Sequence, residues 1–271
     1  MNIMFIVPKF ESGGAEKTIR NLMYYLSKYY PNNNYYQCIM QHETDNDLPS
    51  NVFLLQNDAG KVNGLIPKML CKGKQIVEIN RMKKALKIDI SISFLVGADF
   101  LNVMSNFNID CKTVISLRNN PKEDLKNSSK LYRIIYRWIV RRSDSVVTLS
   151  VNVMDAAIKE FKLQKDTVCC IYNPIPTKID FTEPPIITEL RENKKKVIVT
   201  AGRLTNQKGQ WNLIKAMSEV ILHIPDTVLI ILGEGSLFNE LKTISEKLGL
   251  SDSVMFLGFV PNAIDYIKYA D

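Results

Sequence analysis

The protein has 271 residues, of which 46% are hydrophobic and 23% are charged, and its 12 Gly and 11 Pro residues are scattered along the chain. This composition excludes a collagen-like, low-complexity or intrinsically disordered protein. Lysine and arginine number 35 against 28 aspartate and glutamate residues, which gives a net charge of +7. That charge would suit nucleic acid, a membrane surface or an anionic substrate, and it does not choose among them.

The cysteines point to a reducing compartment. None of the five stands in a C-x-x-C pair, so neither a zinc module nor a disulfide framework is indicated. We expect all of them to be buried thiols: Cys38, Cys71, Cys111, Cys169 and Cys170. Residues 1–8 carry no basic leader, and no stretch approaches the ~20 apolar residues of a bilayer span. The sequence therefore predicts a soluble, cytoplasmic protein.

Short β-branched or aromatic runs alternate with longer helical patterns, which is typical of a parallel sheet covered by helices. The first part has predicted strands at 3–7, 36–40, 52–55, 88–94, 112–116, 145–148 and 168–171. A proline-punctuated segment at 173–185 is predicted to link two domains, 1–185 and 186–271. After it, strands are predicted at 196–201, 227–232 and 254–256, with helices at 210–224, 236–248 and 264–270.

The second domain has only three predicted strands, whereas sheets in such folds have about 5 or 6. We therefore expect the second domain to be incomplete, with residues missing after Asp271.

The positive charge lies in the first domain, which has 25 basic and 18 acidic residues, while the second has 10 of each. It is concentrated at 68–87 and again at 122–142. In 130–142, basic residues recur at helical spacing beside an apolar set: Leu131, Ile134, Ile135, Trp138 and Ile139. The favoured interpretation is an ordinary surface helix whose apolar stripe lies in the core. The alternative is that both basic segments face anionic lipid head groups or a lipid-linked phosphate.

Two predicted strand-to-helix turns carry residues suited to phosphate. Gly13 and Gly14 follow the first strand, where glycine lets the backbone approach a ligand at a helix start. The turn at 202–209 reads GRLTNQKG, and its cations Arg203 and Lys208 could hold a diphosphate between them. Neither turn is a dinucleotide fingerprint, because the G-x-G-x-x-G spacing is absent, and Lys208 stands outside a Walker A pattern.

Three further segments are candidate ligand loops. Gly233 and Glu234 belong to a G-x-G turn that follows a strand. Gly258 and Phe259 follow the next strand and could serve a nucleotide base, although core packing is the favoured interpretation of that segment taken singly. Residues 116–121 close an earlier strand and include Arg118, either as part of a ligand loop or in a turn built on asparagine and proline. With His42 and His223 as the only histidines, neither a histidine base nor a metal site is indicated.

In their order along the chain, GGAEK at 13–17, AGRLTNQKG at 201–209, GEG at 233–235, FLGFV at 256–260 and YAD at 269–271 resemble the family 4 glycosyltransferases. The resemblance implies a GT-B type α/β fold of two Rossmann-like domains. It also implies retaining transfer of a hexose or N-acetylhexosamine from a nucleotide-diphosphate sugar, UDP-linked by expectation, without a cofactor or metal.

By matching position, the resemblance assigns Arg203 and Lys208 to the donor diphosphate. It assigns Gly13 and Gly14 to a close approach to phosphate or sugar, and the Gly258–Phe259 turn to the base. The family pattern continues into two glutamates that this sequence lacks, so the catalytic residues are expected beyond Asp271 and this chain is expected to be inactive alone. Arg118 or Asn119 stands where many relatives have a histidine, which resembles members that build bacterial surface polysaccharides, and Arg118 is a candidate for acceptor contact.

The leading hypothesis is a sugar transferase in cell-surface polysaccharide synthesis, peripheral on the inner face of the membrane. Its partners would be a nucleotide sugar, a lipid-linked or oligosaccharide acceptor and an anionic membrane surface, with no nucleic acid. A second hypothesis is a fragment without turnover that keeps the fold and weak nucleotide binding. A dinucleotide-dependent oxidoreductase is disfavoured by the glycine spacing.

Overall fold

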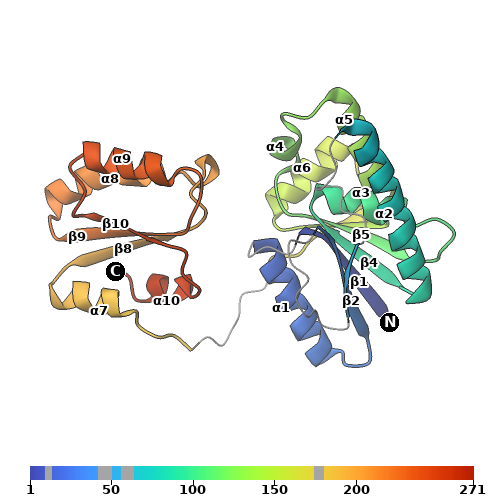
Figure 1. Cartoon of the computed structure of the whole chain (residues 1–271), viewed down its shortest axis with the longest axis horizontal. Helices are drawn as coiled ribbons and strands as arrows, with labels where there is room; N and C mark the ends of the chain where they lie inside the picture. Colours follow the sequence, from blue (N-terminus) through green and yellow to red (C-terminus); the bar gives the residue numbers. More distant parts are fainter. Residues whose placement is uncertain (10–13, 42–50, 56–63, 174–179) are drawn as a thin grey trace. The chain divides into compact units, whose positions relative to one another are not determined.

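The computed structural model describes residues 1–9, 14–41, 51–55, 64–173 and 180–271. The chain forms two compact units, Met1–Ile175 and Pro176–Asp271, each built on a parallel sheet of its own (Figure 1). The expected division after residue 185 falls inside the second of these units, at the start of a helix.

The first unit has a seven-stranded parallel sheet in the order β3-β2-β1-β4-β5-β6-β7. Its strands are β1 (Asn2–Lys9), β2 (Asn34–Gln41), β3 (Val52–Leu54), β4 (Ile90–Phe94), β5 (Lys112–Leu117), β6 (Ser145–Thr148) and β7 (Val168–Cys170). Its helices are α1 (Gly14–Tyr29), α2 (Leu65–Ala85), α3 (Val96–Met104), α4 (Pro121–Leu125), α5 (Lys130–Arg142) and α6 (Val151–Phe161). The order reverses between β1 and β4, and such switch points are where open α/β sheets bind ligands.

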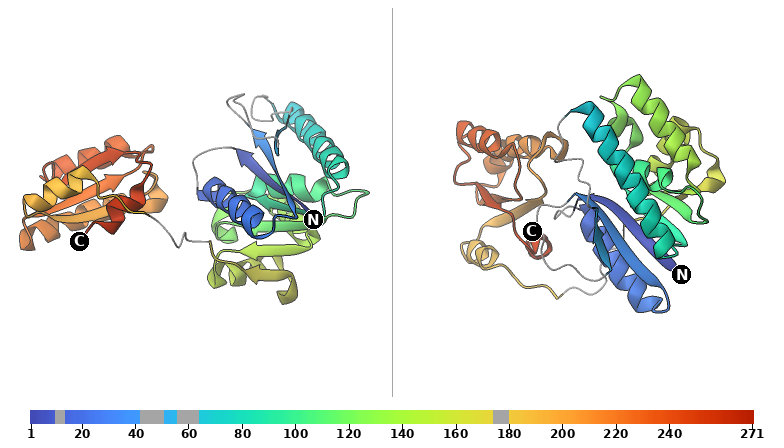
Figure 2. Two further views of the ribbon diagram at one scale, coloured as in Figure 1. Left: turned by 90° about the horizontal axis from the view of Figure 1, so that it is seen from below. Right: turned by 45° about the vertical axis from the view of Figure 1, so that its right-hand side comes forward.

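Alternate side chains of β1 point to opposite faces of this sheet, as the period of two in a strand requires. Phe5 and Val7 pack with α1 on one face, while Met4 and Ile6 pack with α2 and α3 on the other. The connections through α2, α3, α5 and α6 all advance in the same direction across the sheet, so right-handed crossovers place these four helices on one face (Figure 2). Helix α3 packs between α2 and α5.

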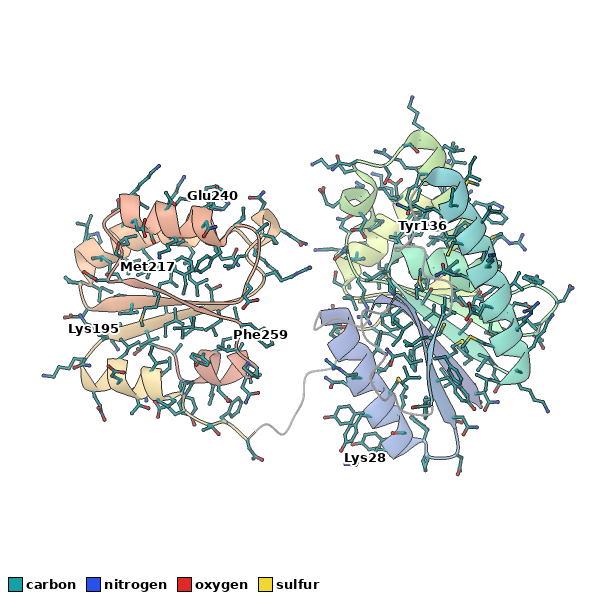
Figure 3. All side chains as sticks on the ribbon, in the orientation of Figure 1. Lys28, Tyr136, Lys195, Met217, Glu240 and Phe259 are labelled. Atoms are coloured by element: carbon teal, nitrogen blue, oxygen red, sulfur yellow. The ribbon has the colours of Figure 1, made fainter. Side chains whose placement is uncertain are left out.

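Polar side chains inside the first unit connect α3 to its neighbours. The Asp99 carboxylate accepts hydrogen bonds from the Ser93 hydroxyl at 2.7 Å and from the Tyr136 hydroxyl at 2.6 Å, and Figure 3 shows Tyr136 inside the unit. The Lys83 ammonium donates to the backbone and side-chain oxygens of Asn102 at 2.8 and 2.9 Å. Burial lowers the pKa of Lys83 to about 8 and raises the pKa of Asp99 to about 7. Buried polar groups of this kind need their partners.

The second unit has a three-stranded parallel sheet in the order β10-β9-β8. Its strands are β8 (Lys196–Ala201), β9 (Thr227–Leu232) and β10 (Val254–Gly258), and its helices are α7 (Pro185–Glu192), α8 (Gln210–His223), α9 (Phe238–Lys247) and α10 (Ala263–Lys268). Helices α8 and α9 cover one face of the sheet, and α7 and α10 cover the other (Figure 1). β9 is buried along its whole length between these layers, with Met217 of α8 above it (Figure 3).

These two parallel α/β units confirm the predicted fold class, and every predicted strand is present with its ends shifted by at most a few residues. Helix α7 was missed because Pro184 and Pro185 favour a linker in the sequence. Pro185 is instead the first residue of the helix, where its missing N–H costs nothing. Among the described helices, none combines the length and apolar character that a membrane crossing requires.

The structure corrects the favoured interpretation of the 130–142 helix. Four of the five residues in its predicted apolar stripe are exposed: Leu131, Ile134, Ile135 and Trp138. The side of α5 that packs in the core consists of Tyr136, Ile139 and Val140. The helix therefore has two apolar sides, and only one of them faces the sheet.

Two smaller expectations are also corrected. Lys83 is only 1% exposed, so it is not part of the basic surface predicted at 68–87. Cys169 is exposed and Cys170 is half-buried, because β7 pairs only with β6 and its outer face is incompletely covered. The other three cysteines are buried as expected.

The Asp99 carboxyl should make the first unit more stable in mild acid than at neutral pH. Its pKa is about 7 in the folded chain and near 3.8 when unfolded, so the folded state binds the extra proton between these values. The free energy of unfolding therefore falls as pH rises through this window. Asp99→Asn should flatten this part of the pH profile, measured by urea unfolding.

Asp144 provides the matched control, because the Thr113 backbone N–H and hydroxyl donate to its carboxylate at 2.8 Å and lower its pKa. When folding lowers the pKa of a carboxyl group, the folded state is stabilised at pH values above the pKa of the unfolded chain. This stabilisation is lost as the pH falls through the pKa of the folded chain. Asp144→Asn should therefore remove a slope of the opposite sign. Equal profiles for Asp99→Asn and the parent would contradict the assignment.

Candidate functional site

Three turns meet at the carboxyl edge of the second unit's sheet, one after each strand. The Gly202 N–H donates to the Leu232 carbonyl at 2.9 Å, and the Gly233 N–H donates to the Gly258 carbonyl at 2.6 Å. The first two turns are also tied to each other, because the Leu204 N–H donates to the Glu234 carbonyl at 2.9 Å. The carboxyl edge of a parallel sheet is where α/β proteins place their ligands.

Two glycines allow these turns to come so close. A β-carbon on Gly233 would lie 2.2 Å from the Gly202 carbonyl oxygen, and one on Gly235 would lie 2.4 Å from the Leu204 oxygen. Gly233 also has φ +124°, which side-chain-bearing residues rarely adopt. The G-x-G pattern is therefore required by backbone packing, whatever the ligand.

The two predicted cations lie at the first of these turns. Arg203 directly follows Gly202, and Lys208 ends a short 3-10 turn, Asn206–Lys208, with its aliphatic stem 3.6 Å from the position of a β-carbon on Gly202. Both side chains are exposed, and neither has a carboxylate partner among the described residues. By contrast, Lys195 and Lys196 at the opposite end of β8 are paired with aspartates. An anion could therefore bind both cations without first displacing an ion pair.

Helix α8 begins directly after Lys208. Gly209 takes a left-handed conformation with φ 66°, and no side chain caps the helix. Gln210 is buried, and its Nε2 donates to the Arg203 carbonyl at 3.1 Å, while its Oε1 has no hydrogen-bond partner. The first N–H groups of the helix and its dipole thus add positive potential beside the two cations.

The second turn contributes an acid, and the third contributes an aromatic ring. The Glu234 side chain is exposed, with its Oε1 3.8 Å from the position of a β-carbon on Gly258. Phe259 is 61% exposed at the end of β10 (Figure 3), so it does not pack in the core. A free aromatic face beside an anion-binding turn suits a planar group such as a nucleobase.

The predicted residues of the first unit are a separate group. Gly13 lies outside the described residues, and Gly14 is the first residue of α1. Arg118 follows β5, stacks on the Phe94 ring at 4.3 Å and donates from Nη1 to Asn173 Oδ1 at 2.6 Å. Burial lowers the pKa of Arg118 to about 10, and its Nε has no hydrogen-bond partner. These contacts give Arg118 a structural role at the carboxyl edge of its sheet.

A hollow of about 600 Å³ lies beside Arg118's loop, between the start of α3 and the helices α4 and α5. Its polar lining consists of Asn119, Asp124, Ser128, Ser129 and Tyr132. The Asn119 amide donates to Asp124 at 3.1 Å, and desolvation raises the pKa of this carboxyl. Amide, carboxylate and hydroxyl groups in one concave site suit a ligand rich in hydroxyls.

The sequence did not reveal this hollow, because its lining comes from short segments without a motif. Gln210 was also missed, although its position at the start of a helix after a cationic turn was a usable signal. Within the described ranges, the acidic residues, cysteines and His223 form no cluster that could hold a metal ion. His42 lies outside the described residues.

Comparison with known proteins relates the segment that contains the three turns to a family. Residues 184–271, which include all three turns, match the family model described as "Glycosyl transferases group 1". The second unit therefore carries the sequence pattern of this family. The chain is 28% identical over 260 residues to an uncharacterized glycosyltransferase of Methanocaldococcus jannaschii, covering 91% of this chain and 62% of that protein. The chain therefore spans less than two thirds of that relative's length.

A second relative of this chain is a Campylobacter jejuni protein named "N-acetylgalactosamine-N,N'-diacetylbacillosaminyl-diphospho-undecaprenol 4-alpha-N-acetylgalactosaminyltransferase". The two are 23% identical over 261 residues, which cover 94% of this chain and 69% of the relative. The crystal structure of HepE from Anabaena in complex with UDP is similar in fold, with a TM-score of 0.75 at 19% identity, covering 100% of this chain and 72% of HepE. The expectation that residues are missing after Asp271 stays a prediction.

Replacing Gly233 by alanine should destabilise the second unit strongly, because the methyl group would lie 2.2 Å from a carbonyl oxygen. Gly249→Ala is the matched control, since Gly249 also has a positive φ, +69°, but nothing lies within 4 Å of its β-carbon position. We expect a loss of about 1 kcal/mol for the control and roughly 3 kcal/mol or more for Gly233→Ala. Urea unfolding followed by circular dichroism measures both losses. Equal losses would show that the close approach is not constraining.

Proposed function

We propose that this protein is a glycosyltransferase that transfers a hexose or N-acetylhexosamine from a UDP-sugar to a lipid-linked glycan, with retention, in cell-surface polysaccharide synthesis. The observation that carries the donor part is that Arg203 and Lys208 are exposed and have no carboxylate partner among the described residues, beside an uncapped helix start. An enzyme that releases a diphosphate must stabilise negative charge on the leaving group, and these groups can do so.

The chemistry of the donor half follows from this placement. Arg203 can bind two phosphate oxygens through its planar guanidinium, and Lys208 adds a point charge from the other end of the turn. The N–H groups at the start of α8 extend the cradle. As the bond to the sugar breaks, charge grows on the diphosphate oxygens, so preorganised cations lower the barrier as well as binding the ground state. No metal or cofactor is part of this proposal.

The other turn residues would hold the rest of the donor. The exposed Phe259 ring offers a stacking surface for the base, and the Glu234 carboxylate can accept hydrogen bonds from hydroxyl groups of ribose or sugar. Structures of HepE with UDP, and with UDP and glucose, share the fold of this chain, which supports UDP as the carrier.

For the acceptor we propose the first unit, where the polar hollow with Asp124 and Tyr132 could bind sugar hydroxyls. Arg118 would act there by positioning, because its guanidinium is already engaged with Phe94 and Asn173. The name of the Campylobacter jejuni relative specifies a diphospho-undecaprenol acceptor, which supports a lipid-linked substrate here. We also propose that the sugar is transferred with retention of its anomeric configuration, and that the protein acts at the cytoplasmic face of the membrane.

Arg203→Ala and Lys208→Ala should each weaken UDP binding by about tenfold or more, because a charge-assisted contact to phosphate contributes roughly 1.5 to 3 kcal/mol. Isothermal titration calorimetry with UDP measures this directly. Lys242→Ala on α9 is the matched control, because it removes an exposed lysine of the same unit away from the three turns.

In a form of the enzyme that turns over, the same variants should lower donor consumption when a UDP-sugar and an undecaprenyl-diphosphate-linked glycan are supplied. UDP affinity equal to that of the parent in both variants would overturn the donor site. Transfer to free monosaccharide at the same rate as to the lipid-linked glycan would overturn the acceptor class and leave the donor site standing.

A further inference from the structure

Helix α5 presents an apolar stripe to solvent. Leu131 is 68% exposed, Ile134 62% and Trp138 47%. These positions are spaced three and four residues apart, so they form one continuous row along the helix, on the side turned away from the core residues Tyr136 and Val140. Exposed apolar residues are ordinary when scattered, but a contiguous row marks a surface that binds something.

Helix α2 carries a second stripe of the same kind. Ile66, Met69 and Leu70 are all exposed, Val77 extends the row, and a β-carbon on Gly73 would meet nothing within 4 Å. The two helices lie on the same face of the sheet and pack against α3 from either side, as Figure 2 shows. α3 is buried between them, so the outer sides of α2 and α5, together with α6, form the surface of this face.

Basic side chains border both stripes. On α5, three arginines lie along one edge of the stripe and donate to backbone carbonyls, and Arg137 is also paired with Glu160. Arg133 donates to the Lys126 carbonyl at 2.7 Å, Arg137 to the Glu160 carbonyl at 2.9 Å and Arg141 to the Phe161 carbonyl at 2.6 Å. Exposed lysines on the two helices add to them: Lys68, Lys72, Lys74, Lys84 and Lys130. α5 contains no acidic residue, and α2 contains only Glu78.

We propose that this face, the outer sides of α2 and α5, lies on a bilayer that contains anionic lipid, with the apolar stripes entering the head-group boundary. This inference rests on the proposed function, because a lipid-linked acceptor would bring the protein to a membrane. Apolar side chains beside lysine and arginine form the pattern of helices that lie in the plane of an interface. Trp138, with the Arg142 guanidinium 5.0 Å above its ring, is suited to the boundary between water and acyl chains.

A second copy of the chain fits this face less well. Docking the same face on itself would bring two basic surfaces together, and like charges oppose each other strongly once water is excluded. A lipid surface supplies negative charge and apolar volume at once, and it needs no shape complementary to two convex helices. The length and polarity of the described helices exclude a bilayer crossing by any of them, so the contact would be peripheral.

The test is sedimentation of the whole chain with phosphatidylcholine vesicles, with and without phosphatidylglycerol, and without donor or acceptor. We expect binding to the anionic vesicles that weakens as salt rises, because screening reduces the charge attraction. Leu131→Ser together with Ile134→Ser should lower vesicle affinity by about tenfold or more. Lys72→Glu with Lys130→Glu should do the same at low salt and have less effect at high salt.

Matched controls distinguish vesicle binding through this face from nonspecific adsorption of the protein. Tyr29→Ser with Tyr30→Ser removes two exposed aromatic residues at the end of α1, on the other face of the sheet. Lys242→Glu with Lys247→Glu changes the same charge on α9 of the second unit. Neither pair should alter vesicle binding. All variants should keep the UDP affinity of the parent, so a failed donor site and a failed membrane face give different results.

Fluorescence locates the contact. The chain has two tryptophans, so Trp211→Phe leaves Trp138 as the only one. In this variant, anionic vesicles should shift the emission to the blue, and brominated lipid should quench it. Equal binding to neutral and anionic vesicles, or an unquenched Trp138, would overturn the proposal. A dimer in gel filtration that Leu131→Ser with Ile134→Ser dissociates would assign the face to a second copy and overturn it as well.

Discussion

The backbone approach of Gly233 to Gly202 is the constraint on which the candidate donor site depends. Parallel strands end at a common edge, but the turns that leave them normally diverge, because side chains keep the backbones apart. Here two turns approach to a distance that no β-carbon allows, and a third is joined to them by the hydrogen bond from Gly233 to Gly258. Residues from three separate strand ends therefore become one surface, and Arg203 and Lys208 are held on it by backbone geometry.

Charge is distributed differently in the two units. The second unit has 11 basic and 12 acidic residues, and among the described residues Arg203 and Lys208 lack the ion pairs found elsewhere in the same unit. In the first unit the excess of basic residues lies largely on α2 and α5. Backbone carbonyl groups orient three arginines of α5. One unit thus offers a local anion site, and the other a broad basic face. Substitutions could therefore change the short-range binding of an anion to the second unit and the long-range attraction of the first unit to negative charge independently.

Sequence patterns predicted much of this structure. The strands were predictable because β-branched runs such as the one in β9 have few other stable environments, and Arg203 and Lys208 were found because a turn with a defined spacing carries its chemistry locally. The patterns were insufficient where tertiary packing decides. α5 has apolar residues on two sides, and nothing local says whether Tyr136 or Ile134 faces the sheet. Lys83 belongs to a basic run, yet α3 and Asn102 enclose it. The polar hollow depends on loops whose residues meet only after folding.

The enclosure of Lys83 has a consequence for covalent labelling. Most other lysines of α2 stand in water and would react with an acylating reagent at once, whereas the amine of Lys83 is covered by α3 and held by Asn102. Its reaction therefore requires α2 to separate from α3. With a lowered pKa, the amine would be a competent nucleophile as soon as it is uncovered. Peptide mass spectrometry of labelling at this one position would then report the opening rate of the first unit, without a probe having to be introduced.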